Sequence, residues 1–135
     1  MDMSNINWLA VIVAAILSLA VGFVWYSKPL FLLPWLKGIE KDESFAQEAN
    51  PMNFVFSFMS SVVEAVFVTF LLNAMGSNTL ISGLTAGFMI WLGFVFTTHW
   101  VNDLFSKRSF GFTLITSGYH LVMLLIMGAL LAVWR

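Results

Sequence analysis

The sequence predicts an all-α integral membrane protein, with four transmembrane helices in a compact bundle and a short helix or re-entrant segment in the first loop. Of the 135 residues, 60% are hydrophobic and only 10% are charged, whereas about a quarter of the residues in a soluble domain are charged. The chain also holds four apolar stretches, each long enough to cross about 30 Å of hydrocarbon at 1.5 Å per residue. We therefore expect a single transmembrane domain over residues 1–135.

The ends of the predicted spans carry residues that suit helix termini or lipid–water interfaces. Trp8 and Trp25 lie near the two ends of the first apolar run, where interfacial tryptophans are expected. Asn50 and Pro51 open the second run as a capping side chain followed by a proline at the first helical position. Ser109 is the expected N-cap of the fourth. The predicted spans are residues 6–26, 51–75, 79–101 and 110–134.

The basic residues are distributed unequally between the two ends of the predicted bundle. Five of the six lie in the two loops 27–50 and 102–109, and the sixth is Arg135. Because loops rich in lysine and arginine stay in the cytoplasm, we predict a cell-membrane protein with both loops cytoplasmic and both termini outside. The lipid bilayer is the expected surrounding, and a net charge of −1 gives no electrostatic basis for binding nucleic acid.

The first loop divides into an apolar half and an acidic half. Pro29 and Pro34 prevent a long straight helix in the apolar half, and Trp35 favours a segment lying at the interface. This half is interpreted either as a lid or docking surface or as an interfacial linker. The second half, IEKDESFAQEAN, holds four acids and one lysine and predicts a short solvated helix.

The stretch GFVWYSKPLFLLPW, with Trp25, Tyr26, Pro29 and Trp35, resembles the signature of the family catalogued as domain of unknown function 1761. In that family a Trp-Tyr-Ser-Pro-like turn precedes a Phe and a second Trp. Further similar stretches are GLTAGFMIWLGFV, DLFSKRS and SGYHLVMLLIMGALLAVW, so the resemblance covers almost the whole chain.

Two positions in that signature depart from the family pattern. Lys28 separates Ser27 from Pro29, where Ser and Pro are expected to be adjacent, and Leu33 stands where glycine is common. The resemblance implies a four-helix membrane protein, and it supplies no catalytic residues.

Glu64 lies inside the second predicted span. No other residue between Asn50 and Asn102 carries a charge. Glu64 lies at helical spacing from Ser60 and Ser61, which predicts that it faces protein rather than lipid.

Small side chains also recur at helical spacing along three of the predicted spans. They include Ser18 and Gly22 in the first span, Ala65 in the second, and Gly83 and Gly87 in the third. Small residues let helix backbones approach closely within a membrane, so these positions are predicted helix-packing sites.

Helix arithmetic suggests a partner for Glu64. Counted from the cytoplasmic side, Glu64 lies about 20 Å and His120 about 17 Å into their spans, so we predict that the two side chains meet. Tyr119 and Thr116 are the nearby hydroxyl donors, and His99 is expected at a shallower depth. Two interpretations stay open: a proton relay shared by acid and imidazole, or a neutral acid whose hydrogen bond joins two helices, worth about 0.6–2 kcal/mol.

The sequence offers little for a metal, a cofactor or a catalytic triad. There is no cysteine, the two histidines are expected about two turns apart in depth, and no third nitrogen or sulfur ligand is apparent. Asp103, four residues after His99, could bind an ion at the interface. We therefore expect no metal and no cofactor, and no Ser-His-acid geometry can be argued.

Three classes of function remain from the sequence. The first is a proton-linked transporter or channel, which would be a homo-oligomer because four helices enclose too little polar lining for a pathway. The second is a non-catalytic accessory or scaffold subunit of a larger membrane complex. The third is an intramembrane enzyme acting on a lipid, which the residues support least.

Overall fold

A computed structural model describes residues 3–135, and that part of the chain is helical without strands. It contains four helical segments that are long and apolar enough to cross a membrane, which confirms the predicted fold class. The segments are α1 (Trp8–Trp25), α4 (Met52–Ala74), the continuous run of α5 (Leu80–Ile90), η2 (Trp91–Phe96) and α6 (Thr97–Phe105), and α7 (Phe110–Val133).

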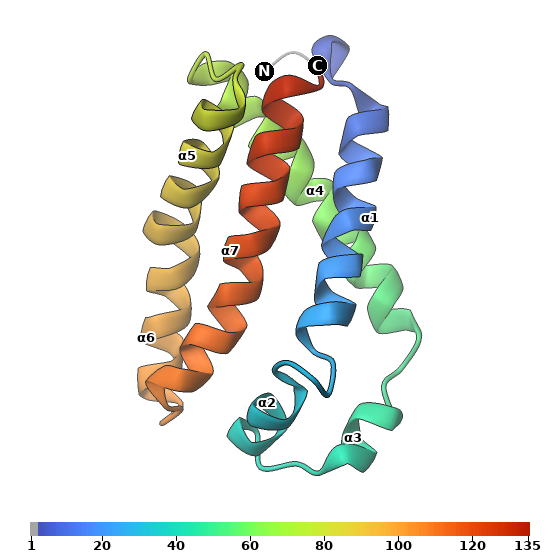
Figure 1. Cartoon of the computed structure of the whole chain (residues 1–135), viewed down its shortest axis with the longest axis vertical. Coiled ribbons are helices and arrows are strands. Elements are labelled where there is room, and N and C mark those ends of the chain that lie inside the picture. Colours follow the sequence, from blue (N-terminus) through green and yellow to red (C-terminus); the bar gives the residue numbers. More distant parts are fainter. Residues whose placement is uncertain (1–2) are drawn as a thin grey trace.

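The two ends of the bundle differ in what connects the helices (Figure 1). At one end, called here the termini end, lie the 3₁₀ turn η1 (Met3–Asn5), the turn between α4 and α5, and the end of α7. At the opposite end, called here the loop end, lie the turn between α6 and α7 and the two short helices α2 (Leu32–Gly38) and α3 (Glu43–Gln47).

Local sequence signals explain where the long helices begin and where α4 stops. The side-chain oxygens of Asn7, Asn50, Thr79 and Ser109 each accept a hydrogen bond from a backbone amide in the first turn of the following helix. Such caps satisfy amides that have no partner within the helix. After α4, Gly76 adopts a φ of +64°, a left-handed conformation that favours glycine.

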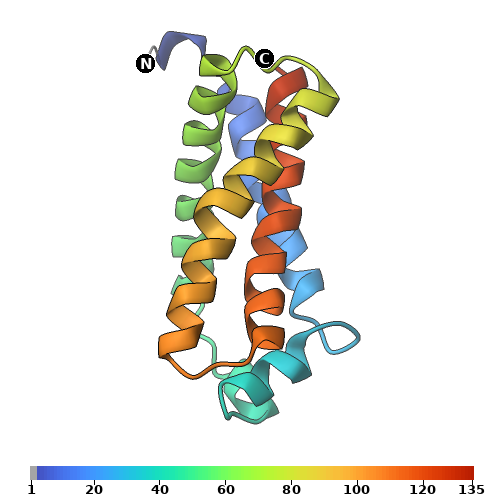
Figure 2. The same cartoon turned by 90° about the vertical axis from the view of Figure 1, so that its left-hand side faces the viewer.

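Helix α7 is the centre of the bundle. It packs against α1, α4 and α5, and its contact with α5 is the most extensive in the molecule, whereas α4 and α5 hardly touch. Figure 1 shows the lower part of α4 beside α1, and Figure 2 shows the run from α5 to α6 crossing in front of α7. The helices on the two sides of α7 therefore meet α7 rather than each other.

The apolar core lies toward the termini end. Its members come from the first half of α1, the second halves of α4 and α7, and the first half of α5: Ala10, Val11, Ala14, Ala65, Val68, Leu72, Ala86, Met123, Met127 and Leu131. Toward the loop end the first turns of α4 are exposed from Met52 to Ser57. The bundle is thus closely packed at one end and more open at the other.

The first loop folds back beneath the bundle instead of extending away from it. The indole Nε1 of Trp25 donates to the carbonyl of Ile115 at 2.9 Å, and the rings of Tyr26 and Trp35 lie 5.5 Å apart between centroids. Helix α2 contacts α7. Pro29 lies exposed in the turn before α2. The signature residues of this loop therefore attach it to the loop end of the bundle.

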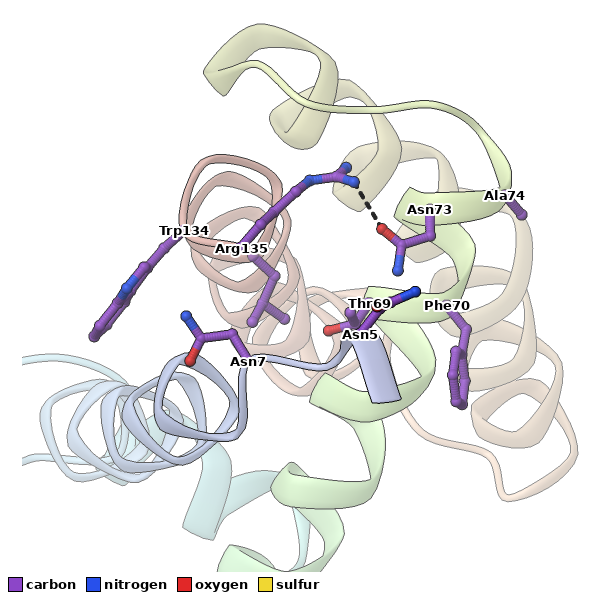
Figure 3. Close-up of a pocket in the computed structure, with 9 residues that line it drawn as sticks. Asn5, Asn7, Thr69, Phe70, Asn73, Ala74, Trp134 and Arg135 are labelled. Carbon is purple, nitrogen blue, oxygen red and sulfur yellow. Dashed lines mark hydrogen bonds between the residues drawn. The ribbon is translucent and has the colours of Figure 1, made fainter. Parts of the chain in front are cut away.

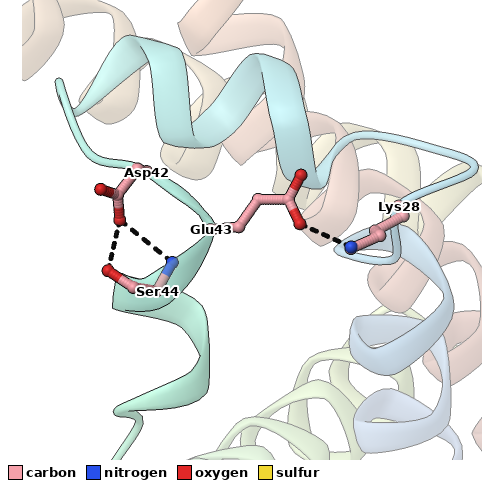
Figure 4. Close-up of polar contacts among 4 residues, drawn as sticks. All are labelled: Lys28, Asp42, Glu43 and Ser44. Atoms are coloured by element: carbon pink, nitrogen blue, oxygen red, sulfur yellow. Dashed lines mark hydrogen bonds and ion pairs between the residues drawn. The ribbon is translucent and has the colours of Figure 1, made fainter.

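The acidic half of the loop forms the short exposed helix α3, as predicted (Figure 4). Asp42 caps this helix by accepting a hydrogen bond from the amide of Ser44 at 3.0 Å. Glu43 forms an ion pair with Lys28, and both side chains are largely exposed, so this pair contributes little to stability.

The third apolar segment differs from a regular helix in a way that the sequence did not predict. Its six residues Trp91–Phe96 are π-helical, and the helix then continues to Phe105, beyond the predicted end at residue 101. The hydroxyls of Thr97 and Thr98 donate to the carbonyls of Gly93 and Phe94 at 3.0 and 2.6 Å. π-helical turns inside α-helices occur frequently near functional sites.

Candidate functional site

An open groove with a volume of about 720 Å³ lies between residues 56–64 of α4 and the middle of α7. It is called here the α4–α7 groove. Its lining residues are Phe56, Ser57, Met59, Ser60, Ser61, Val63, Glu64, Tyr119, His120 and Met123. The volume lies within the range of about 300–1,000 Å³ that is typical of small-molecule sites.

Glu64 is the acid of this groove. It is half-buried on α4, one turn from the exposed Ser60 and the buried Ser61. Within residues 3–135 its carboxyl group forms no hydrogen bond and no ion pair. The structure therefore places Glu64 and His120 in one groove without a hydrogen bond between them, and the role of the pair stays a prediction.

Tyr119 forms the wall of the groove next to α1. Its hydroxyl donates to the carbonyl of Ser18 at 3.1 Å, and a Cβ built on Gly22 would lie 3.5 Å from its ring. The small residues of α1 thus give Tyr119 room to lie flat against that helix. The same ring contacts the ring of His120 at 5.0 Å between centroids.

Two imidazoles meet behind the groove, and this corrects the predicted position of His99. The rings of His99 and His120 lie 5.3 Å apart between centroids, although the depth estimate put His99 nearer the surface. The estimate took residue 101 as the end of the span, whereas the helix continues to Phe105, so His99 lies about 9 Å rather than about 3 Å from the helix end. Side chains lean toward the N-terminus of their helix, and α6 and α7 are antiparallel, so these two imidazoles lean toward one another.

The polar partners of the two imidazoles differ. The Thr116 hydroxyl lies 3.4 Å from Nδ1 of His99 and within 3.2 Å of the carbonyl of Phe112. Nδ1 of His120 is buried without a hydrogen-bond partner among the described residues. One imidazole is therefore oriented by a hydroxyl, and the other keeps a free ring nitrogen.

The two histidines are close enough to share a metal ion, contrary to their expected difference in depth. Two imidazoles alone do not form a metal site. Within residues 3–135, no group of three or more His, Cys, Asp or Glu side chains is arranged to hold an ion. Asp103 is not placed to bind an ion exposed at the interface, because it is buried against α7.

The contact of Asp103 is the polar feature that sequence reasoning missed. The hydroxyl of Thr113 donates to its carboxylate Oδ2 at 2.6 Å, and both side chains are buried. The bond joins the last turn of α6 to the first turn of α7 across the short turn at 106–109. The signal for it was present, because an acid and a hydroxyl that flank a tight helix hairpin are brought together by the turn.

The predicted helix-packing glycines lie at the contact of α5 with α7. A Cβ on Gly83 would come within 2.2 Å of the carbonyl oxygen of Gly128, and one on Gly87 within 2.3 Å of that of Leu124. In this part of the bundle the two backbones touch with no side chain between them, as small residues permit. Ala65 and Ser18 are likewise buried between helices.

A second pocket of about 580 Å³ lies at the termini end (Figure 3). Asn7, Asn73 and Arg135 are among its lining residues, and the Arg135 guanidinium donates to the Asn73 side chain at 2.8 Å. The same guanidinium donates to the backbone carbonyls of Ala132 and Ser77. Arg135 therefore joins α7 to the turn between α4 and α5, an arrangement that no sequence pattern predicts.

The fold and the groove define an all-helical membrane protein with an ionisable group inside its transmembrane region. The chain belongs to the family described as "Protein of unknown function (DUF1761)", whose model matches residues 9–132. No curated protein and no solved structure matches the chain. The family supports the architecture, and any function must be argued from the groove.

Proposed function

We propose that this chain is one subunit of an oligomeric proton-linked transporter or channel, in which Glu64 takes up and releases the proton. The observation that carries the proposal is the position of Glu64. It lies in an open groove at the middle of a transmembrane helix, without an ion pair in the part of the chain that the structure describes. Intramembrane acids in such positions commonly mark ion or substrate pathways.

The surroundings of Glu64 suit reversible protonation. A charged acid at the centre of a bilayer costs about 2.5–3.5 kcal/mol on insertion scales, so low polarity favours the neutral acid and a polar partner favours its ionisation. His120 and Tyr119 line the same groove, and His99 lies against His120. These groups can hold or pass a proton close to the acid.

An oligomer follows from the openness of the groove. Ser57 and Ser60 are exposed on α4, where lipid would leave their hydroxyls without partners beyond their own helix. A second chain beside the exposed serines would supply these partners and extend the polar path, while the groove stays open to lipid at Phe56, Met59 and Val63. Both loops lie at one end of the bundle (Figure 1), which is compatible with cytoplasmic loops and external termini.

The proposal is tested by replacing the acid with its neutral isostere. Wild-type protein and Glu64→Gln are reconstituted into liposomes that contain a pH-sensitive dye, and proton movement is followed after a panel of cationic, anionic and neutral amphipathic compounds is added. We expect at least one class of compound to move protons with the wild type and none with the variant. Glu48→Gln, an exposed acid in the loop, is the matched control and is expected to behave as wild type.

Either of two results would contradict the proposal. If Glu64→Gln folds normally and moves protons at the wild-type rate, Glu64 is not the proton carrier. Proton movement that is absent for the wild type with every class of compound would also reject the proposal.

The alternative is an accessory or scaffold subunit, which the exposed polar side of α4 also supports. In that case the groove is covered by a different protein. The subunit would copurify with one fixed partner in mild detergent and would move no protons when reconstituted alone, which separates the two functions.

A further inference from the structure

We propose that the substrate of the α4–α7 groove is an amphipathic cation, which enters from the bilayer and places its charge against Glu64. This inference rests on the proposed function, because it names the substrate class of the same site. It comes from three features of the groove: its charge, its apolar rim and the side to which it opens.

The charge of the groove is set by one acid. Among the described residues, 3–135, no lysine or arginine lines it, and Glu64 is the single acid of its lining. The titratable groups near this carboxyl are Tyr119 and His120 of α7, with His99 of α6 behind His120. Helix α1 contributes no titratable side chain between Trp8 and Trp25.

A bound cation would stabilise the ionised form of Glu64 inside the groove. Ionised Glu64 is unfavourable in a medium of low polarity unless an opposite charge lies close by, and within residues 3–135 its carboxyl has no ion-pair partner. An anion would face the same carboxyl and would be repelled. A monovalent cation would neutralise the carboxylate and leave the groove without net charge.

The rim of the groove requires the rest of the ligand to be apolar. Phe56, Met59 and Val63 lie along it with 60%, 57% and 55% of their surface exposed. Met123 lies at its floor and is buried. Aromatic faces attract cations and aromatic groups alike, and a methionine side chain adapts to ligands of varied shape.

The direction of opening favours entry from the membrane. The groove runs from Phe56, near the loop end of α4, to Glu64 at the middle of that helix, between two helices that are apolar enough to cross the membrane. Because its rim residues are apolar and more than half exposed, we place the entry of the ligand in the lipid phase beside α4. Compounds that are apolar around a delocalised charge partition into that phase, whereas small hydrated ions do not.

Binding has a defined proton balance. If the carboxyl is neutral before binding, a monovalent cation displaces one proton, because RCOOH plus the cation gives the ion pair of RCOO⁻ with the cation and one H⁺. No bond other than the O–H bond breaks. Proton release therefore reports occupation of the site by a cation and is absent for a neutral ligand.

A pair of probes with the same shape and opposite charge tests the inference. Tetraphenylphosphonium and tetraphenylborate are each titrated into the full chain in detergent, in two buffers of different ionisation enthalpy, so that calorimetry counts released protons. We expect the phosphonium to bind with about one proton released, and the borate to show no binding above detergent alone. Glu64→Gln is expected to weaken phosphonium binding at least tenfold and to abolish the proton release, while Glu48→Gln leaves both unchanged.

The outcomes separate this inference from the proposed function. Binding of the borate in preference to the phosphonium, or equal phosphonium binding by wild type and Glu64→Gln, overturns the cation assignment even if Glu64 still carries protons. Phosphonium binding that depends on Glu64, combined with proton movement that Glu64→Gln retains, keeps the cation site and rejects the transport mechanism. Binding of neither probe overturns the inference.

Discussion

The two sides of α7 are built in opposite ways. On the side of α5, Gly83 and Gly87 bring the backbone against Gly128 and Leu124 with no side chain between the helices. On the side of α4, the middle of the interface is an open groove that holds Glu64. One side of the same helix is closed by direct backbone contact, and the other is left unfilled around a carboxyl group.

This difference separates a structural face from a functional one. Close packing leaves no room for a ligand or a change of side-chain position, so the α5 side is suited to holding the bundle together. The α4 side exposes polar side chains where nothing in the described chain covers them, and such groups are costly in lipid without a role or a partner. We therefore expect stability to depend on the α5 side of α7, and the proposed function lies on the α4 side.

The largest expected loss of stability comes from adding a side chain at the contact between α5 and α7. Gly83→Ala would place a Cβ within 2.2 Å of a backbone oxygen that cannot rotate away, so the helices must separate at a cost of about 1–3 kcal/mol. Unfolding titrated with sodium dodecyl sulfate in mixed micelles would measure the loss of stability.

The matched control for this variant is a glycine that contacts nothing. A Cβ on Gly93 has open space around it, and Gly93→Ala is expected to leave stability unchanged or raise it by up to about 1 kcal/mol, since alanine favours helix. Equal stability of Gly83→Ala and the wild type would mean that the α5 side is not the rigid one.

A smaller loss of stability is expected at the loop end, where α6 meets α7. Thr113→Val removes the donor of the 2.6 Å hydrogen bond to Asp103 and keeps the volume of the side chain. A buried acceptor left without its partner costs about 1–3 kcal/mol, and the lower half of that range is expected because waters at the loop end can reach the turn. Thr98→Val, at an exposed position that bonds only within its own helix, is the control; an equal loss in both variants would contradict the account.

The smallest expected change in stability is in the first loop, which lies outside the α4 and α5 sides of α7. The side-chain and backbone hydrogen bonds from Ser44 lower the pKa of Asp42 from its ordinary value of 3.8. A lowered folded pKa means that the cap stabilises α3 above pH 3.8 and that this contribution is lost as the pH falls through the folded value. The protection of the α3 amides, measured relative to their intrinsic exchange rate at each pH, should therefore fall at low pH in the wild type and already be reduced at neutral pH in Asp42→Ala. Protection that is independent of pH would show that the cap contributes nothing.

The fold was predictable because it depends on local properties of the sequence. Apolar length and low charge identify the four membrane segments, and Gly83 with Gly87 identifies a face that packs closely. The partner of that face was missed, although Gly128 and Ala132 form a small-residue pair four positions apart in α7 and both lie against Gly83. Which helices meet depends on the path of the loops, which periodicity does not encode.

The candidate site was predictable only in part. Counting residues placed Glu64 and His120 at one depth, and both line the same groove. The same count failed for His99, because α6 extends to Phe105 beyond the predicted end of the span and so places His99 deeper, beside His120. The opening of the groove was beyond sequence reasoning, because it depends on how α4 packs against α7.

The central claim is that Glu64 lies on the open side of α7 and can be reached from the bilayer. Carbodiimide labelling followed by mass spectrometry tests it directly, because a membrane-soluble carbodiimide reacts with neutral carboxyl groups in contact with lipid and a water-soluble one reaches the loop acids. The account predicts modification of Glu64 by the membrane-soluble reagent alone, with protection by tetraphenylphosphonium. A Glu64 that stays unmodified by the membrane-soluble reagent, while the loop acids react normally with the water-soluble one, would contradict it.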